Sequence, residues 1–129
     1  MENITLLGID FGSKRVGLAI SHGIIAEAIK SLPYDAVFDE EISKLVKDQH
    51  INKIIVGLPL DKDGETAQSK LIKEQAGKLA ELLGIEIIFV DEAYSSLEAD
   101  RLHGRDKNFD RDSESAKIIL DQYLNETRN

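Results

Sequence analysis

The sequence of 129 residues contains no cysteine and no tryptophan. The lack of cysteine excludes disulfide bonds and thiolate metal sites. With four phenylalanines and three tyrosines, the chain has no basic and aromatic stripe on which nucleic-acid bases could stack. No secretion signal opens the sequence, and no apolar run approaches the length needed to cross a membrane. We therefore expect a cytoplasmic protein that does not bind membranes.

The chain also lacks an excess of positive charge. It has 24 acidic against 16 basic residues, which gives a net charge of −8. A passive nucleic-acid coat protein would be basic, because neutralisation of phosphates drives such binding. An enzyme whose carboxylates hold divalent cations is compatible with this charge, since the cations reverse the local field. The length and composition predict one globular domain over residues 1–129.

Apolar periodicity predicts an α/β fold. The sheet is expected to be antiparallel on one side and parallel where helices connect the strands. The unbroken apolar runs in 53–60 and 85–90 predict strands buried on both faces. The expected strands are 6–10, 15–21, 24–31, 53–60 and 85–90, the helices are 37–49, 66–83, 95–102 and 112–124, and the loops are 59–65 and 103–111.

Residues 4–21 form the most informative stretch. Two apolar runs flank a turn at 12–14, and Asp10 stands where the first run ends. A carboxylate at the end of an apolar strand must be desolvated, paired or metal-bound, because a bare buried charge is costly. Asp10 is therefore the first candidate for chemistry. The alternative is that Asp10 caps the strand end as an Asx-type turn residue.

Further acids stand at similar places in the chain. Asp91 and Glu92 end the last predicted strand, and Asp112 begins the final predicted helix. The carboxyl ends of parallel strands form one edge of a sheet, where open α/β folds place their sites. Carboxylates gathered at this edge are hard ligands suited to Mg²⁺ or Mn²⁺. Such ions can activate water and stabilise the leaving oxygen when a phosphodiester is cut.

Two of these acids also have a structural alternative. Asp112 has the residue type favoured at a helix N-cap. Asp91 can orient the loop while Glu92 ligates the metal, although Asp91 is also a further candidate ligand.

Other polar residues fit the site less well. Asp61 and Asp63 have the composition of a solvated loop. His22, His50 and His103 fit no zinc spacing, and His103 lies closest in sequence to the predicted site.

Four motifs in this order resemble the YqgF family over nearly the whole chain. These RNase H-like proteins are described as Holliday-junction resolvases and as pre-16S ribosomal RNA nucleases. The resemblance implies a mixed five-stranded RNase H-like sheet flanked by helices. The motifs are Leu7-Gly-Ile-Asp10-Phe-Gly12-Ser-Lys-Arg-Val-Gly17, Ile55-Val-Gly57-Leu-Pro59-Leu60-Asp-Lys-Asp-Gly64, Val90-Asp91-Glu92 and Asp112-Ser-Glu-Ser115-Ala116.

The resemblance also implies which residues act. Asp10, Glu92 and Asp112 match the family's metal-binding catalytic positions. Ala93 stands where the family usually has arginine, which removes a cation that could bind the scissile phosphate. The segment before Asp112 is unusually acidic, with Asp106 and Asp110.

The leading hypothesis is a nuclease, dependent on Mg²⁺ or Mn²⁺, that cuts structured RNA or branched DNA. Lys14, Arg15 and Arg105 are candidate phosphate contacts, although Lys14 and Arg15 could also merely solvate the hairpin. Gly12 and Gly17 permit close backbone approach. A resolvase acting on a two-fold junction would be expected to dimerise, but the sequence leaves monomer and homodimer open.

Two other hypotheses come from different classes of protein. A non-catalytic interaction module in ribosome assembly would fit the acidic balance and Ala93. An ATP-binding domain of the actin type has a similar first phosphate loop, but such proteins need two domains around the nucleotide.

Overall fold

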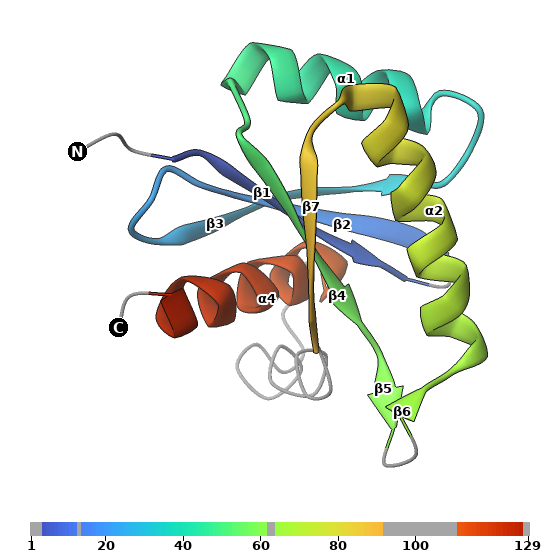
Figure 1. Ribbon diagram of the computed structural model, residues 1–129. Coiled ribbons are helices and arrows are strands. Elements are labelled where there is room, and N and C mark those ends of the chain that lie inside the picture. The colour runs from blue at the N-terminus through green and yellow to red at the C-terminus, as the bar shows by residue number, and fades with distance from the viewer. Residues whose placement is uncertain (1–3, 13, 62–63, 92–110, 128–129) are drawn as a thin grey trace.

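The fold is a mixed sheet of five strands in the order β3-β2-β1-β4-β7 (Figure 1). It is described from a computed structural model, which places residues 4–12, 14–61, 64–91 and 111–127. The sheet confirms the predicted fold class. The strands are β1 (Leu6–Phe11), β2 (Arg15–Ser21), β3 (Ala26–Pro33), β4 (Lys53–Leu58) and β7 (Glu86–Asp91).

The strand directions follow from the connections. β1, β2 and β3 are antiparallel neighbours joined by short turns, whereas β1, β4 and β7 are parallel. Parallel neighbours need a crossover, and helices α1 (Phe38–Gln49) and α2 (Ala67–Leu83) provide it. The third helix, α4 (Arg111–Thr127), follows the sheet.

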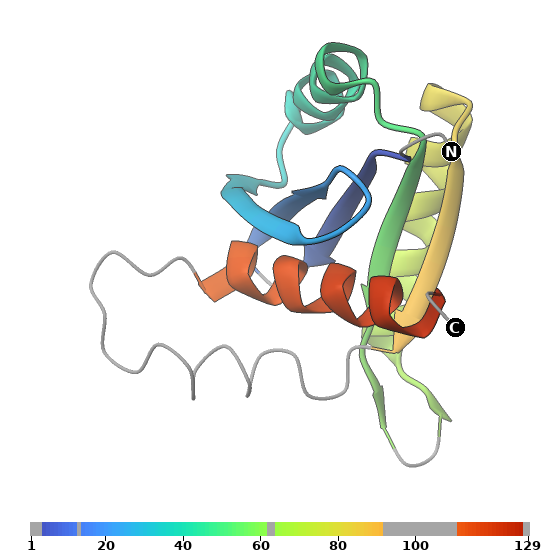
Figure 2. The ribbon, with the colours of Figure 1, turned by 90° about the vertical axis from the view of Figure 1, so that its left-hand side faces the viewer.

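The helices cover the two faces of the sheet unequally. Figure 2 shows α4 lying across one face, which we call the α4 face, with α2 behind β4 and β7 on the other. We call this other side the α1/α2 face. Successive residues of a strand point to opposite faces, so β1 contributes Leu6 to the α4 side and Leu7, Ile9 and Phe11 to the α1/α2 side.

Local signals in the sequence explain where α2 begins and where α1 and α2 end. Thr66 caps α2, because its hydroxyl accepts a hydrogen bond from the Ser69 N–H at 3.0 Å while the Ser69 hydroxyl accepts one from Thr66 N–H at 2.9 Å. Gly84 ends α2 in the left-handed conformation at φ 63°, which glycine adopts more readily than other residues. His50, one of the histidines without a zinc spacing, ends α1 in the same conformation at φ 55°.

Two predicted segments differ from the structure in their bounds. The solvated loop predicted at 59–65 contains a small hairpin of β5 (Leu60–Asp61) and β6 (Gly64–Glu65). The third strand spans Ala26–Pro33 rather than 24–31, and Ile24 and Ile25 before it are exposed.

The strand predicted to be buried at 85–90 is the edge strand β7, where Phe89 is 38% exposed. No strand lies beyond β7 in the sheet as far as the described residues show, so part of its apolar run stays open to solvent. β4, between β1 and β7, is buried on both faces as predicted. The helix predicted at 95–102 and most of the loop at 103–111 lie outside the described residues. Among the helices that are described, none is long and apolar enough to cross a membrane.

Candidate active site

Asp10 lies on the α4 face near the carboxyl end of β1. It is 6% exposed, and β1 continues to Phe11, so Asp10 is a buried strand residue rather than a cap at the strand end. Its partner across the antiparallel pair with β2 is Gly17. Residues directly opposite in such a pair point to the same face of the sheet. The space above Gly17 is therefore next to the Asp10 carboxylate.

The first turn of α4 occupies the space above Gly17. A Cβ atom at Gly17 would collide with the carbonyl oxygen of Asp112 and would lie 2.7 Å from the Ser113 nitrogen. Only a residue without a side chain lets the α4 backbone come this close to β2. The close approach predicted for Gly17 is therefore made by α4 itself, and it brings Asp112 onto the face that carries Asp10.

The turn after β1 lies beside the Asp112 side chain. The Gly12 N–H donates to the Arg15 carbonyl oxygen at 2.9 Å. A Cβ atom at Gly12 would lie 2.7 Å from that oxygen and 3.4 Å from Oδ1 of Asp112. The Asp112 carboxylate thus reaches the turn two residues after Asp10. Asp10 and Asp112 therefore both lie on the α4 face, near the carboxyl end of β1.

The structure does not support an N-cap role for Asp112. α4 begins at Arg111, so Asp112 lies inside the first turn, together with Glu114. Negative charges in this turn interact favourably with the helix dipole. Ser113 and Ser115 beside it are buried, and within the described part of the chain the Ser115 hydroxyl has no hydrogen-bond partner.

The chemistry of this pair fits a hard divalent cation. Two carboxylates on one partly buried surface repel each other, and a cation relieves this repulsion while accepting oxygen ligands. Glu92, the third predicted ligand, lies outside the described residues, and within the described ranges no three acidic or histidine side chains group together. Because Ile88 and Val90 pack on the α4 side, strand alternation places Asp91 on the α1/α2 side, opposite to the face of Asp10.

Of the predicted phosphate contacts, some lie within the described residues and one does not. Lys14 and Arg15 are exposed beside the turn that contains Gly12, where both can meet a phosphate. Arg105 lies outside the described residues.

The structure describes some of the polar residues that fitted the predicted site less well. Asp61 is the last residue of β5 and pairs with Gly64 in the small hairpin, whereas Asp63 and His103 lie outside the described residues. The His22 ring approaches the Thr5 hydroxyl at 3.5 Å, just before the amino end of β1.

Sequence reasoning missed a groove beside Gly12 on the α1/α2 face. Tyr34, which is 46% exposed, lines it together with Lys14 and residues of α2. Burial of the ring and the charge of Asp39 raise the pKa of Tyr34, against the effect of its hydrogen bond with Gln75. The sequence signal that could have pointed to this groove is Tyr34 itself, an aromatic residue directly after Pro33, where β3 ends.

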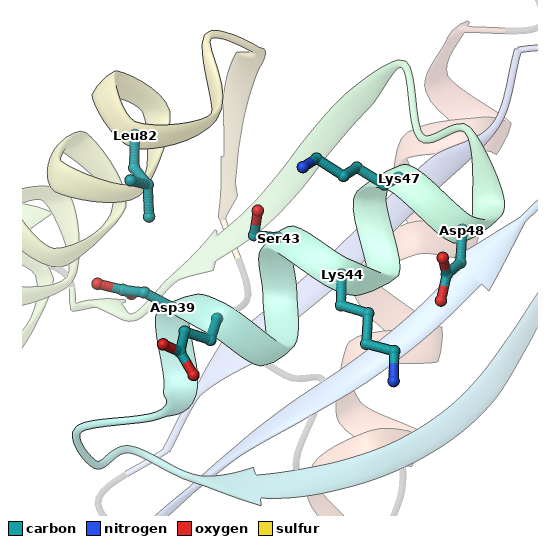
Figure 3. Close-up of a pocket in the computed structure, with 7 residues that line it drawn as sticks. Asp39, Ser43, Lys44, Lys47, Asp48 and Leu82 are labelled. Carbon is teal, nitrogen blue, oxygen red and sulfur yellow. The ribbon is translucent and has the colours of Figure 1, made fainter.

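A second hollow lies away from these carboxylates, between α1 and the last turn of α2 (Figure 3). Its volume is about 560 Å³, and it mixes lysines with more numerous acids. Leu82 lies near the amino end of β7, whereas Asp10 lies at the carboxyl edge. The described side chains that line it are Asp39, Glu40, Ser43, Lys44, Lys47, Asp48 and Leu82.

Comparison with known families gives one match over residues 4–126, to the family described as "RuvX: Holliday junction resolvase". A protein of Picosynechococcus sp. is 35% identical over 139 residues, covering 99% of this chain and 96% of its own. A protein of Sulfurihydrogenibium sp. is 39% identical over 128 residues, covering 92% of this chain and 88% of its own. Both carry the name "Putative pre-16S rRNA nuclease".

Solved structures show the same fold at low identity. T. thermophilus RuvC in complex with a Holliday junction substrate superposes with a TM-score of 0.59 at 10% identity, covering 96% of each chain. The fowlpox virus Holliday junction resolvase gives 0.56 at 11% identity, covering 95% of this chain and 99% of its own. These two similarities support the RNase H-like arrangement of the sheet and helices.

Proposed function

Because the chain belongs to the RuvX family of Holliday junction resolvases, we propose that it is a metal-dependent endonuclease for structured nucleic acid. One observation carries this proposal. Gly17 lets α4 place Asp112 on the face that holds the buried Asp10. Two carboxylates on one face repel each other, and a divalent cation bound between them relieves this repulsion.

Each residue has a role in this proposal. Asp10 and Asp112 hold Mg²⁺ or Mn²⁺, and Glu92 joins them by its resemblance to the family motif. The bound cation supplies Lewis-acid stabilisation of the charge that develops on the phosphate oxygens during hydrolysis. Lys14 and Arg15 orient the strand by its phosphates, and they bring positive charge to a protein with a net charge of −8.

Gly12 has no side chain that would project from the turn beside Asp112, so that a nucleic-acid backbone can come close to the carboxylates. Arg105, outside the described residues, is proposed as a further phosphate contact. Residues 1–129 are proposed to act as a single domain.

Precursor 16S ribosomal RNA is the first substrate to test. The relatives that are 35–39% identical are named for pre-16S rRNA, whereas a solved neighbour bound to a Holliday junction is 10% identical. A four-way DNA junction is therefore the second substrate. A nuclease acting on ribosomal RNA would work where ribosomes are made, which keeps the expected cytoplasmic location as part of this proposal.

A non-catalytic module in ribosome assembly is the second candidate. The net charge of −8 and the alanine at position 93 favour it. In that case Asp10 would be a structural residue, and neither the wild type nor a variant at Asp10 would cleave the substrates above background.

Cleavage of both substrates with Mg²⁺ or Mn²⁺ tests the proposal. Wild type is compared with Asp10→Asn and with Asp48→Asn, which removes the same charge from the exposed surface of α1. We expect wild type and Asp48→Asn to cut and Asp10→Asn to fail while staying folded by circular dichroism. Equal background for all three proteins would instead support the assembly module.

A further inference from the structure

The groove beside Gly12 has a composition unlike the acidic chain around it. Its volume is about 570 Å³, within the usual range for a ligand pocket. Among the described residues that line it, Lys14 is the one charged side chain. The described lining residues are Phe11, Gly12, Lys14, Val16, Tyr34, Ala67, Gln68, Leu71, Ile72 and Gln75.

The groove and the candidate active site share one residue, Gly12. Gly12 lines the groove, and the Asp112 carboxylate reaches the same residue from the α4 face. Asp10 and Phe11 are neighbours in β1 and point to opposite faces of the sheet. A nucleic-acid strand whose phosphate lies at Asp10 and Asp112 would therefore reach the groove by passing around the edge of the sheet. Gly12 lies between the two and presents no side chain that would block the passage.

Tyr34 forms a fixed aromatic wall of the groove. Its ring centroid lies 5.0 Å from that of Phe38 and 6.1 Å from that of Phe11, which are separations typical of aromatic pairs. Gln75 of α2 hydrogen-bonds with the hydroxyl. These contacts position the ring, while 46% of Tyr34 stays exposed and is available for stacking.

The opposite wall is the first part of α2, and its chemistry is neutral. Leu71 is 52% exposed and adds apolar surface, while Gln68 and Gln75 provide amide groups that can both donate and accept hydrogen bonds. α2 has no acid in its first turn, in contrast to α1 with Asp39, Glu40 and Glu41 and to α4 with Asp112 and Glu114. The wall therefore does not repel a polyanion.

We propose that this groove binds one unpaired nucleobase of the substrate strand, next to the phosphate that is cut. The base stacks on Tyr34 and Leu71, its edge meets the amides of Gln68 and Gln75, and Lys14 contacts the adjoining phosphate. An aromatic face with a nearby cation is the usual means of holding a single-stranded base without strong sequence preference. This inference rests on the proposed nuclease function and defines its substrate as a strand with an unpaired base at the site.

Binding of a labelled single-stranded RNA tests the inference without cleavage. The Asp10→Asn protein is titrated with Ca²⁺ present, using the intact oligonucleotide and a series in which one abasic nucleotide is moved along the strand. We expect one abasic position to weaken binding by about 5- to 100-fold, as loss of one stacked base does. Added Tyr34→Ala should weaken binding of the intact strand similarly and remove this sensitivity, whereas Tyr34→Phe should retain it.

Leu71→Ser and Leu82→Ser form a matched pair that avoids the risk of unfolding. Both leucines are exposed on α2, at 52% and 59%, but only Leu71 lines the groove among the described residues. We expect Leu71→Ser to weaken binding of the intact strand several-fold and Leu82→Ser to leave it unchanged. Equal binding by Leu71→Ser, Tyr34→Ala and the parent protein would overturn the inference.

Cleavage measured in parallel separates this inference from the proposed function. If the wild type cuts and Tyr34→Ala cuts with the same KM and the same abasic sensitivity, the groove is not a subsite and the nuclease stands. If the wild type does not cut, while binding still depends on Tyr34 and on one base, the nuclease is wrong and the base-binding groove stands.

Discussion

The two faces of the sheet differ in how tightly they are packed near the carboxyl end of β1. On the α4 face, Gly8 and Gly17 let the helix backbone approach so closely that a Cβ atom at Gly8 would lie 3.0 Å from the Ala116 carbonyl oxygen. On the α1/α2 face, large side chains such as Phe11 and Phe38 fill the space, and a groove stays open beside them. The tight face therefore fixes charged groups, and the looser face leaves room for a ligand.

This contrast teaches that missing side chains can position an active site. The carboxylates on the α4 face come from β1 and α4, about a hundred positions apart in the chain. Their meeting depends on Gly17, which is neither charged nor polar. Substitutions that displace α4 or remove its carboxylate should therefore lower cleavage more than stability, whereas loss of the cap at the start of α2 should do the reverse.

The largest effect is expected for Asp10→Asn. Loss of one charge from the metal site should lower the cleavage rate on the order of 10³-fold, since charges held in place before the reaction stabilise the transition state strongly. The free energy of unfolding should stay the same or rise, because a buried negative charge next to Asp112 is removed. Single-turnover cleavage and urea unfolding measure the two quantities. A stable variant that still cuts at the wild-type rate contradicts a role for Asp10.

Gly17→Ala should have the next largest effect. The new methyl group must push α4 away, which should cost about 1–3 kcal/mol of stability as overpacking does and about 10²-fold in cleavage through misplacement of Asp112. Gly77→Ala in α2 is the control, because a Cβ atom there meets nothing within 4 Å. It should keep full activity and gain up to about 1 kcal/mol in helix stability. Equal losses in both variants would refute the positioning role.

Lys14→Ala should weaken substrate binding moderately at low salt. A phosphate contact releases counterions, so its removal should lower the slope of log affinity against log salt by about 0.7–0.9. Lys47→Ala, in the last turn of α1, should leave the slope unchanged. Fluorescence anisotropy over a range of salt concentrations gives both slopes, and the same slope for Lys14→Ala and the wild type argues against the contact.

The smallest effect is expected for Thr66→Ala at the start of α2. The variant loses the reciprocal hydrogen bonds with Ser69, which should cost about 1 kcal/mol of stability. Cleavage under saturating substrate should not change, because Asp10 and Asp112 belong to the other face. Thermal unfolding and a rate measurement check both parts, and a parallel loss of activity would show that the two faces are coupled.

A shared site of Asp10 and Asp112 stays a prediction. The sequence predicted the fold class, because strand alternation and helix periodicity are local patterns. It did not predict that β7 is partly exposed, since burial of a strand depends on what lies beyond it in the sheet. The groove at Tyr34 was missed for a similar reason. Its walls come from the end of β3 and the start of α2, and no local pattern records that these segments meet.

Binding of Mn²⁺ tests most directly whether Asp10 and Asp112 form one metal site. Electron paramagnetic resonance would follow free Mn²⁺ during titration of the wild type, Asp10→Asn, Asp112→Asn and the surface control Asp48→Asn. We expect the wild type and Asp48→Asn to bind Mn²⁺ with the same affinity, and each of the other two variants to lose about 10-fold or more, as loss of a charged ligand requires. The same affinity in all four proteins would contradict the site.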